Sequence, residues 1–240
     1  MDLDVLFADN HVLVINKQAG ILAQPDITGK PDILSLAKRF IKATCHKPGG
    51  VYLGLVHRLD RQASGVMVLA RTSKAASRLS ACFRQHAAVK KYMVIVEGRC
   101  SGSGTFSDYI VKHGRTVSIV PGTHQGARYA TLNWHAVASC GDLTLMSVEL
   151  ITGRPHQIRI QCAHRGLPLL GDRRYGSSRV FGEEAIALHC YMLGIPHPIS
   201  RTFQVWTAPP PAYWRGYFDD AINGLIKAAH QGWSEGSGHS

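Results

Sequence analysis

Residues 56–70 join a basic loop to an apolar run: Val56-His57-Arg58-Leu59-Asp60-Arg61-Gln62-Ala63-Ser64-Gly65-Val66-Met67-Val68-Leu69-Ala70. The apolar part shows no alternation with polar residues, which is typical of a short strand buried on both faces. Asp60 stands before this strand, where a side chain can reach the floor of a cleft. A carboxylate kept ionised by neighbouring cations can act as a nucleophile or a general base. These residues alone are explained equally well by a loop carboxylate paired with Arg58 or Arg61.

The positive charge of the chain is concentrated around this stretch. The 240 residues carry 27 Lys and Arg against 16 Asp and Glu, a formal net charge of +11. Residues 33–96 hold twelve of the basic residues and a single acid, Asp60, so the whole excess falls in about a quarter of the chain. A surface that only has to be soluble mixes both signs. The excess therefore favours a polyanionic partner, with nucleic acid ahead of small acidic substrates.

The overall composition excludes several classes of protein. Hydrophobic residues make up 45% and charged residues 18% of the chain, which fits a globular protein with a sizeable core and excludes disorder for most of its length. No stretch approaches the ~18 apolar residues of a membrane helix, and the acidic start is unlike a signal peptide. We therefore expect a cytoplasmic protein without membrane contact. The six cysteines are widely spaced and the histidines lack metal-ligand spacing, so we expect no metal and no other cofactor.

The pattern along the chain predicts an α+β fold, because strands and helices mix without strict alternation. Residues 5–8 and 11–16 read as two strands around an Asp9-Asn10 turn. Helices are predicted over 31–44, with Pro31 at the first position, and over 73–88, with Ser73 as the cap. The remaining expectations are strands over 91–96, 129–134, 143–150 and 202–206, a peripheral hairpin within 98–126, a helix between Gly153 and Gly166, an end of regular structure at 208–211, and a mobile tail over 232–240.

A second group of polar residues lies at the start of the helix expected after Gly153. It reads Thr152-Gly153-Arg154-Pro155-His156-Gln157-Ile158-Arg159. Taken alone, it is explained by a helix start whose polar side chains face solvent. The chain also lacks the sequence signatures of a phosphate-binding loop, a zinc protease and a nucleophile elbow.

His57-Arg58-Leu59-Asp60 with Ser64-Gly65, taken together with the motif over 152–159, resembles the RluA-type family of RNA pseudouridine synthases. The likeness covers most of the chain in order, through 12–20, Lys91-Tyr92, 166–176, 188–189, 197–198 and 208–209. The resemblance implies the pseudouridine synthase fold: a mixed, mainly antiparallel sheet flanked by helices, with a central catalytic cleft.

The resemblance also implies a reaction and three catalytic residues. The family isomerises a uridine already in RNA: the bond from C1′ to N1 breaks, the base turns, and C5 joins C1′, with no cofactor consumed. Asp60 matches the essential aspartate, which either attacks covalently or removes a sugar proton. Tyr92 matches the active-site tyrosine that stacks on the target base. Arg159 matches the basic residue that pairs with the aspartate.

The target base must leave its stack before its sugar can react, and Arg58 resembles a residue that helps to hold the RNA open. Structured ribosomal or transfer RNA is therefore the expected partner. Two rival hypotheses are a non-catalytic RNA-binding protein or RNA chaperone with the same fold, and an aspartate-dependent hydrolase. Besides Arg58, the residues expected to contact RNA are His57, Arg61, Lys91, Arg154 and His156.

Three positions depart from the family pattern. Gln18 stands where a proline is usual, Ala63 where a threonine is usual, and Gln161 where a histidine is common. They lie beside the matched motifs, so they bear on loop geometry and RNA contacts more than on the reaction. We expect a monomer with one catalytic domain over 1–216, no separate RNA-binding domain before it, and a C-terminal extension over 217–240.

Overall fold

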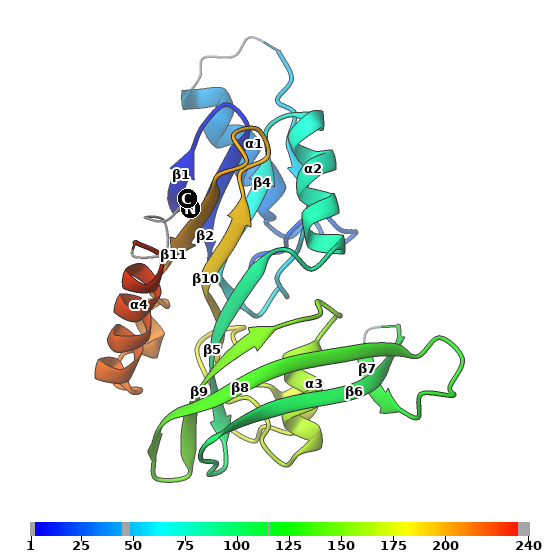
Figure 1. Cartoon of the computed structure of the whole chain (residues 1–240), viewed down its shortest axis with the longest axis vertical. Helices are drawn as coiled ribbons and strands as arrows, with labels where there is room; N and C mark the ends of the chain where they lie inside the picture. The colour runs from blue at the N-terminus through cyan, green and yellow to red at the C-terminus, as the bar shows by residue number, and fades with distance from the viewer. Residues whose placement is uncertain (1–2, 45–48, 115, 235–240) are drawn as a thin grey trace.

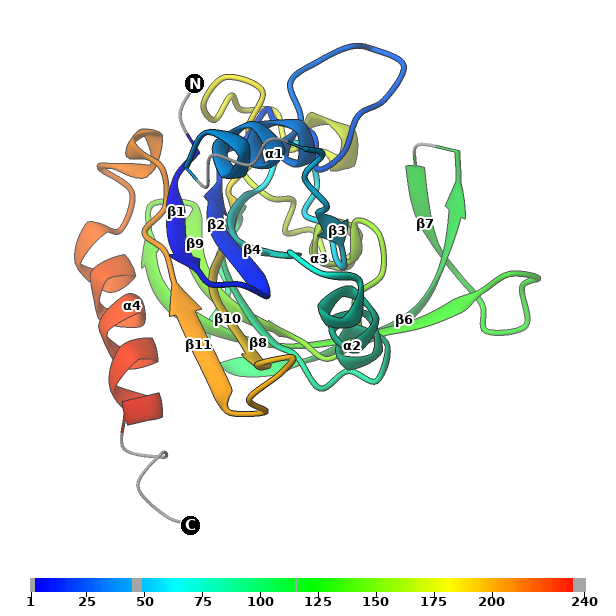
Figure 2. The same cartoon turned by 90° about the horizontal axis from the view of Figure 1, so that it is seen from above.

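The chain folds around one large, curved sheet, shown in Figures 1 and 2. A computed structural model describes residues 3–44, 49–114 and 116–234. Within these ranges the sheet has eleven strands. They are β1 (Val5–Ala8), β2 (Val12–Lys17), β3 (Gly54–Leu55), β4 (Ser64–Ala70), β5 (Val89–Glu97), β6 (Ser103–His113), β7 (Thr116–Val120), β8 (Arg128–Cys140), β9 (Leu143–Leu150), β10 (Leu188–Pro196) and β11 (Phe203–Thr207). The helices are α1 (Ile33–Thr44), α2 (Ser73–Arg84), α3 (Gln157–His164) and α4 (Asp219–Ser234), with short 3₁₀ turns at Arg173–Tyr175 and Ala212–Trp214.

The strands follow the order β1-β2-β4-β10-β5-β9-β8-β6-β7, while β3 pairs with β4 and β11 with β10. Among the described residues, β4 and β10 form the single parallel pair, and the other pairs are antiparallel. The α+β class and the mixed, mainly antiparallel sheet expected from the sequence are confirmed. At one end, β6, β7 and β8 project from the body of the molecule (Figure 1).

The parallel contact between β4 and β10 depends on Gly65. This residue pairs with Cys190 and has a φ of +122°, a conformation that side chains disfavour. A Cβ atom at this position would lie 2.3 Å from the carbonyl oxygen of Cys190. Cys190 also pairs with Tyr92 on the other side of β10. A glycine therefore allows β10 to lie between the strand that follows Asp60 and the strand that carries Tyr92.

Helices cover both faces of the sheet. On one face, Leu13 and Met67 belong to a hydrophobic cluster that includes residues of α1 and α3. The side chains that alternate with them, such as Val68, pack with Leu79 of α2. Further along that second face, Met93 lies in a cluster with α4. Successive side chains of β2, β4 and β5 thus point alternately to the two faces of the sheet and form a hydrophobic layer on each. Each residue of β4 is buried, which confirms the expectation that this strand is buried on both faces.

The first two predicted helices form, but with other ends and caps. Helix α1 begins at Ile33, because the Asp32 carboxylate accepts a hydrogen bond from Ser35 N at 2.9 Å. Helix α2 is capped by Thr72, whose hydroxyl accepts from Ala75 N at 3.1 Å. It ends at Arg84, four residues before the predicted end. Pro31 is therefore not the first residue of α1, and Ser73 is the first residue of α2 but not its cap.

The end of the chain differs more from the sequence expectation. Strand β10, which the sequence pattern did not predict, is almost wholly buried at the centre of the sheet. Regular structure also continues past 208–211, because α4 packs its apolar side chains against the sheet. The predicted tail over 232–240 overlaps the last turn of α4, and its residues 235–240 lie outside the described residues.

Lys17 at the end of β2 is buried completely and holds the loop that carries Asp60. Its ammonium donates to the carbonyl oxygens of Gln18, Asp60, Arg61 and Ala63 at 3.0, 3.2, 3.1 and 2.8 Å. Burial lowers the pKa of Lys17 to about 7, and the Asp60 carboxylate acts in the opposite direction. One buried cation thus organises four backbone carbonyls that would otherwise lack donors.

We predict that Lys17→Met lowers the free energy of unfolding by about 2–4 kcal/mol, because buried carbonyl oxygens of the loop lose their donor. Urea unfolding followed by circular dichroism measures the change. The control Lys38→Met lies on the exposed side of α1 and should change stability by less than ~0.5 kcal/mol. Equal stability of Lys17→Met and the wild type would show that the hydrogen bonds from Lys17 to the four carbonyl oxygens do not stabilise the loop.

Candidate active site

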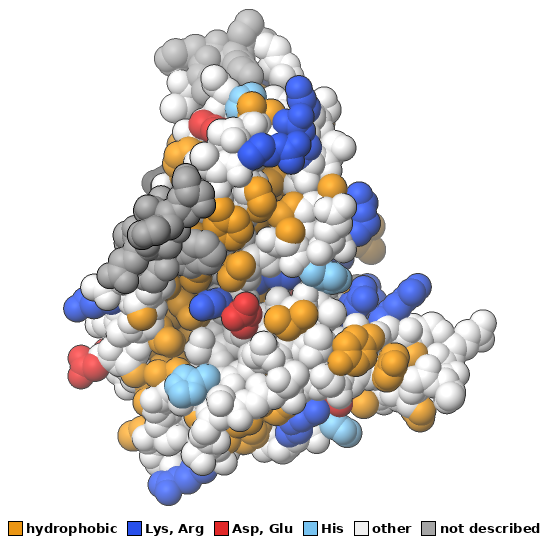
Figure 3. Space-filling view, in the orientation of Figure 1, with side chains coloured by type: hydrophobic (Ala, Val, Ile, Leu, Met, Phe, Trp, Pro, Cys, Tyr) orange, Lys and Arg blue, Asp and Glu red, His pale blue; other side chains and the backbone are white. Residues whose placement is uncertain are grey.

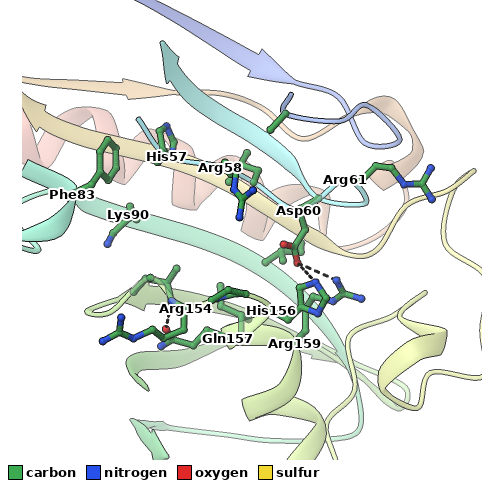
Figure 4. Close-up of a pocket in the computed structure, with 18 of the residues that line it drawn as sticks. His57, Arg58, Asp60, Arg61, Phe83, Lys90, Arg154, His156, Gln157 and Arg159 are labelled. Atoms are coloured by element: carbon green, nitrogen blue, oxygen red, sulfur yellow. Dashed lines mark hydrogen bonds and ion pairs between the residues drawn. The ribbon is translucent and has the colours of Figure 1, made fainter. Parts of the chain in front are cut away.

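A cleft of about 830 Å³ opens between the loop over 57–63 and the start of α3 (Figure 4). Its walls come from residues 22–26, 56–63, the end of α2, β5 and residues 153–159. In Figure 3, Lys and Arg side chains gather where the body of the molecule meets the projecting strands. The basic residues that line the cleft are Arg58, Arg61, Arg84, Lys90, Lys112, Arg154 and Arg159, against the acids Asp26 and Asp60. The site is therefore built to receive an anion.

Asp60 lies in the cleft with its carboxylate directed at Arg159 (Figure 4). Arg159 Nη1 donates to Asp60 Oδ2 at 3.0 Å, and His156 Nε2 lies 3.9 Å from the same oxygen. The Asp60 side chain keeps 26% of its surface exposed. The carboxylate is therefore oriented by a cation and still open to a substrate. The pairing of Asp60 with Arg159 was expected from the sequence, and the alternative partners Arg58 and Arg61 do not form ion pairs with it.

Arg159 is itself fixed by a second carboxylate. Its Nε and Nη2 donate to the two oxygens of Asp172 at 2.6 and 2.8 Å, and its side chain is only 3% exposed. Burial acts to lower the pKa of Arg159, but the two carboxylates outweigh it and raise that pKa. The guanidinium therefore stays charged and rigid between Asp172 and Asp60. Asp172 belongs to the matched stretch over 166–176, but its residue type alone gave no sign of this role.

His156 is oriented by Tyr175. Its Nδ1 lies 2.8 Å from the Tyr175 hydroxyl, and that oxygen accepts from Val117 N at 3.1 Å. The hydroxyl hydrogen is thus free to bond to Nδ1, which favours a His156 tautomer with its proton on Nε2, facing Asp60. Burial lowers the pKa of His156, so the ring is neutral near pH 7. The residue has a φ of +51° and precedes α3, which turns its side chain into the cleft.

Tyr92 lines the cleft from β5 and is 7% exposed. Burial raises the pKa of its phenol well above the usual value, so it stays protonated. Alternation along β5 gives Lys90 the same side of the strand as Tyr92 and gives Lys91 the other. Lys90 lines the cleft, whereas Lys91 does not. The structure therefore offers no support for the RNA contact expected of Lys91, and Lys90, which was not among the expected residues, lies in the cleft.

The other residues expected to contact RNA have different surroundings. Arg58 and Arg154 line the cleft, and Arg154 Nε donates to the carbonyl oxygen of Tyr129 at 3.1 Å. Arg61 also lines the cleft, but it forms an ion pair with Glu184. The Glu184 carboxylate also pairs with the ammonium of Lys30, at 3.2 Å. Arg58 and Arg154 thus have more charge available for a ligand than Arg61 has.

His57 has a structural part in the cleft wall. Its Nε2 accepts a hydrogen bond from Val68 N at 3.0 Å, and its ring stacks on Phe83 with centroids 4.4 Å apart. Burial, with a smaller effect of Lys90, lowers the pKa of His57 to about 3. The ring is therefore neutral, with its hydrogen on Nδ1.

The three departures from the family pattern are accommodated mostly by backbone. The carbonyl oxygens of Gln18 and Ala63 accept from Lys17, a contact that does not depend on their side chains. Gln161 is buried and donates to Asp108 Oδ2 at 2.6 Å and to the carbonyl oxygen of Ala130 at 3.2 Å. Ala63 lines the cleft, whereas Gln18 and Gln161 do not.

The described residues include no group of three or more His, Cys, Asp or Glu side chains placed to hold a metal ion. No helix among them is both long enough and apolar enough to cross a membrane.

Comparison with known proteins identifies the family. Residues 11–164 match the family described as RNA pseudouridylate synthase. An RNA pseudouridine synthase of Synechocystis that is named as uncharacterized is 33% identical over 223 residues, which cover 88% of this chain and 67% of that protein. The ribosomal large subunit pseudouridine synthase D of Yersinia pestis is 31% identical over 224 residues, covering 87% of this chain and 67% of that protein.

Solved structures share the fold. Human RNA pseudouridylate synthase domain containing 4 superposes with a TM-score of 0.72 at 21% identity, covering 93% of each chain. Human RNA pseudouridylate synthase domain containing 1 gives a TM-score of 0.71 at 21% identity, covering 95% of each chain. The family match extends over both the loop of Asp60 and the start of α3, and the fold extends over nearly the whole chain. The chain belongs to the RluA-type family of RNA pseudouridine synthases, which are isomerases.

Proposed function

We propose that this protein converts a specific uridine in structured ribosomal or transfer RNA to pseudouridine, with Asp60 as its essential carboxylate. The observation that carries the proposal is the geometry of Asp60: a partly exposed carboxylate, held by the guanidinium of Arg159 at 3.0 Å, in a cleft lined by basic residues. The relative from Yersinia pestis is named for the large ribosomal subunit, which supports ribosomal RNA as the substrate class.

The reaction needs a group that promotes cleavage between C1′ and N1 without a cofactor. Asp60 supplies it, either by covalent attack or by taking up a sugar proton, and Arg159 keeps the carboxylate ionised and aimed. Tyr92 presents an aromatic ring on which the detached base can stack while it turns. Its phenol stays protonated because of burial, so the ring carries no charge next to the base.

A uridine inside folded RNA reaches this carboxylate only after it leaves its stack. The cleft has room for a nucleotide and is lined by Arg58, whose guanidinium forms no ion pair within the described residues. We propose that Arg58 contacts the RNA from which the base has left, which offsets part of the few kcal/mol that unstacking costs. Arg154 contributes a second cation on the opposite wall (Figure 4).

We predict that Asp60→Asn abolishes pseudouridine formation and leaves RNA affinity within a few-fold of the wild type. The amide keeps the size of the side chain but removes its nucleophilic and basic character. Pseudouridine is measured in total RNA from a strain that lacks the gene, after incubation with each purified protein. Asp142→Asn serves as control, because Asp142 is exposed and pairs only with Arg179 among the described residues. Wild-type activity of Asp60→Asn would overturn the assignment.

We predict a steep loss of RNA affinity with salt. Five of the basic residues that line the cleft form no ion pair within the described residues, and each phosphate that they neutralise releases counterions. Binding should weaken by about 10²–10³-fold between 50 and 200 mM KCl. Fluorescence anisotropy with a labelled RNA stem-loop measures it. An RNA affinity that changes little with KCl concentration would mean that RNA does not bind along the cleft. The five residues are Arg58, Arg84, Lys90, Lys112 and Arg154.

We predict that Asp172→Asn lowers kcat by about 10–100-fold and changes KM little. Asp172 does not line the cleft, but it fixes the guanidinium that aims Asp60, and small losses of alignment have effects of this size. Steady-state kinetics on the mapped RNA substrate separates kcat from KM. A rise in KM with kcat unchanged would place Asp172 in RNA binding instead of positioning.

A further inference from the structure

Lys90 is a buried cation without a partner. The residue is 6% exposed and its side chain points into the cleft from β5 (Figure 4). Within the described ranges, its ammonium forms no hydrogen bond and no ion pair. This differs from the other two buried cations of the site, since Lys17 has four carbonyl partners and Arg159 has two carboxylates.

Such an arrangement is unfavourable for the protein alone. Burial removes water from the ammonium, and an unpaired buried charge destabilises the folded state. The same burial lowers the pKa of Lys90. Groups of this kind are typical of binding sites, where a ligand completes the pairing that the protein lacks.

The neighbours of Lys90 include an N–H donor, and the carboxylate that acts on it, Glu149, does not line the cleft. His57 is neutral, and its Nε2 accepts from Val68 N, which leaves the Nδ1 hydrogen as a donor. The thiols of Cys82 and Cys190 have pKa values raised by burial, so both are protonated. Glu149 acts on Lys90 only from a position that does not line the cleft.

Lys90 also has a fixed position relative to the reaction centre. It lies two residues before Tyr92 on the same side of β5, which separates the two along the strand by about 6.6 Å. A nucleotide whose base stacks on Tyr92 therefore has its sugar-phosphate backbone within reach of a flexible lysine. Every ribose in RNA is flanked by phosphodiesters, which carry the anion that an ammonium and an N–H donor recognise.

We propose that Lys90, with His57 beside it, forms a subsite for one phosphodiester group next to the target uridine. The inference rests on the proposed function, because it places an RNA nucleotide in the cleft. The subsite fixes the register of the strand, so that the sugar of the uridine stands over Asp60. It is occupied by the RNA backbone and makes no contact with the base itself.

The test compares Lys90→Met with Lys91→Met, its matched neighbour on the other side of β5. The ligand is a fluorescent short oligouridylate, and its Kd is measured by anisotropy across a range of KCl concentrations. Lys90→Met should weaken binding about tenfold in low salt and reduce the slope of log Kd against log [KCl] by about 0.7, the value for one phosphate contact on a single strand. Lys91→Met should leave both quantities unchanged. Equal slopes for Lys90→Met and the wild type would overturn the subsite.

A second set of ligands locates the phosphate. Each is the same oligouridylate with one phosphodiester replaced by an uncharged methylphosphonate. For the wild type, one or two replacements should weaken binding about tenfold, and Lys90→Met should not distinguish those ligands from the unmodified one. If the wild type and Lys90→Met respond identically to every replacement, Lys90 does not contact a phosphate.

Thermal unfolding gives an independent readout. Methionine fills the space of the lysine stem and removes the unpaired charge, so Lys90→Met should raise the Tm of the free protein by a few degrees while it weakens RNA binding. A lower Tm would assign Lys90 a structural part in the fold. Failure of the proposed function is recognised separately, because the wild type would then form no pseudouridine even if the oligouridylate measurements come out as expected.

Discussion

The guanidinium of Arg159 lies between two carboxylates, and the geometry of the site depends on it. Asp172 binds it through both oxygens, and Asp60 binds the nitrogen that remains directed toward the cleft. The three groups come from α3, from the segment after it and from the loop before β4. Removal of one partner from a buried pair is costly because it leaves a charge unpaired. The pairing thus ties the two walls of the cleft together.

Lys17 acts on the same carboxylate through the backbone. It binds the carbonyl oxygens of the loop, Asp60 among them, while Arg159 binds the side chain. Neither interaction requires a particular side chain at Gln18 or Ala63, the two positions beside this loop that depart from the family pattern. Backbone and side chain of Asp60 are therefore positioned by separate cations, which lie on different elements of the fold.

Sequence patterns predicted the local parts of this architecture well. The hairpin of β1 and β2, the buried strand β4 and the pairing of Asp60 with Arg159 lie in short motifs with clear periodicity or a recognisable family match. Strand β10 and helix α4 were missed because the features that define them are tertiary. β10 pairs with β5 and β11 along its length and with β4 through the close approach that Gly65 allows, and α4 packs on the sheet.

The roles of the charged residues also depend on tertiary structure. Adjacent lysines such as Lys90 and Lys91 look alike in a sequence, and only the side of β5 that each occupies separates a cleft residue from one outside it. The excess charge over 33–96 likewise combines several roles. Arg58, Arg61, Arg84 and Lys90 line the cleft, whereas Lys38 and Lys74, for example, are exposed on α1 and α2.

Three buried cations therefore divide the work of the site according to their partners. Lys17 and Arg159 are fully paired within the protein, so they stabilise one arrangement of the loop and of Asp60 before any substrate arrives. Lys90 is also buried, but its ammonium forms no hydrogen bond and no ion pair within the described residues. A cation that the protein leaves unpaired, two residues from the tyrosine on which the base is proposed to stack, is best explained by an anion that enters with the substrate.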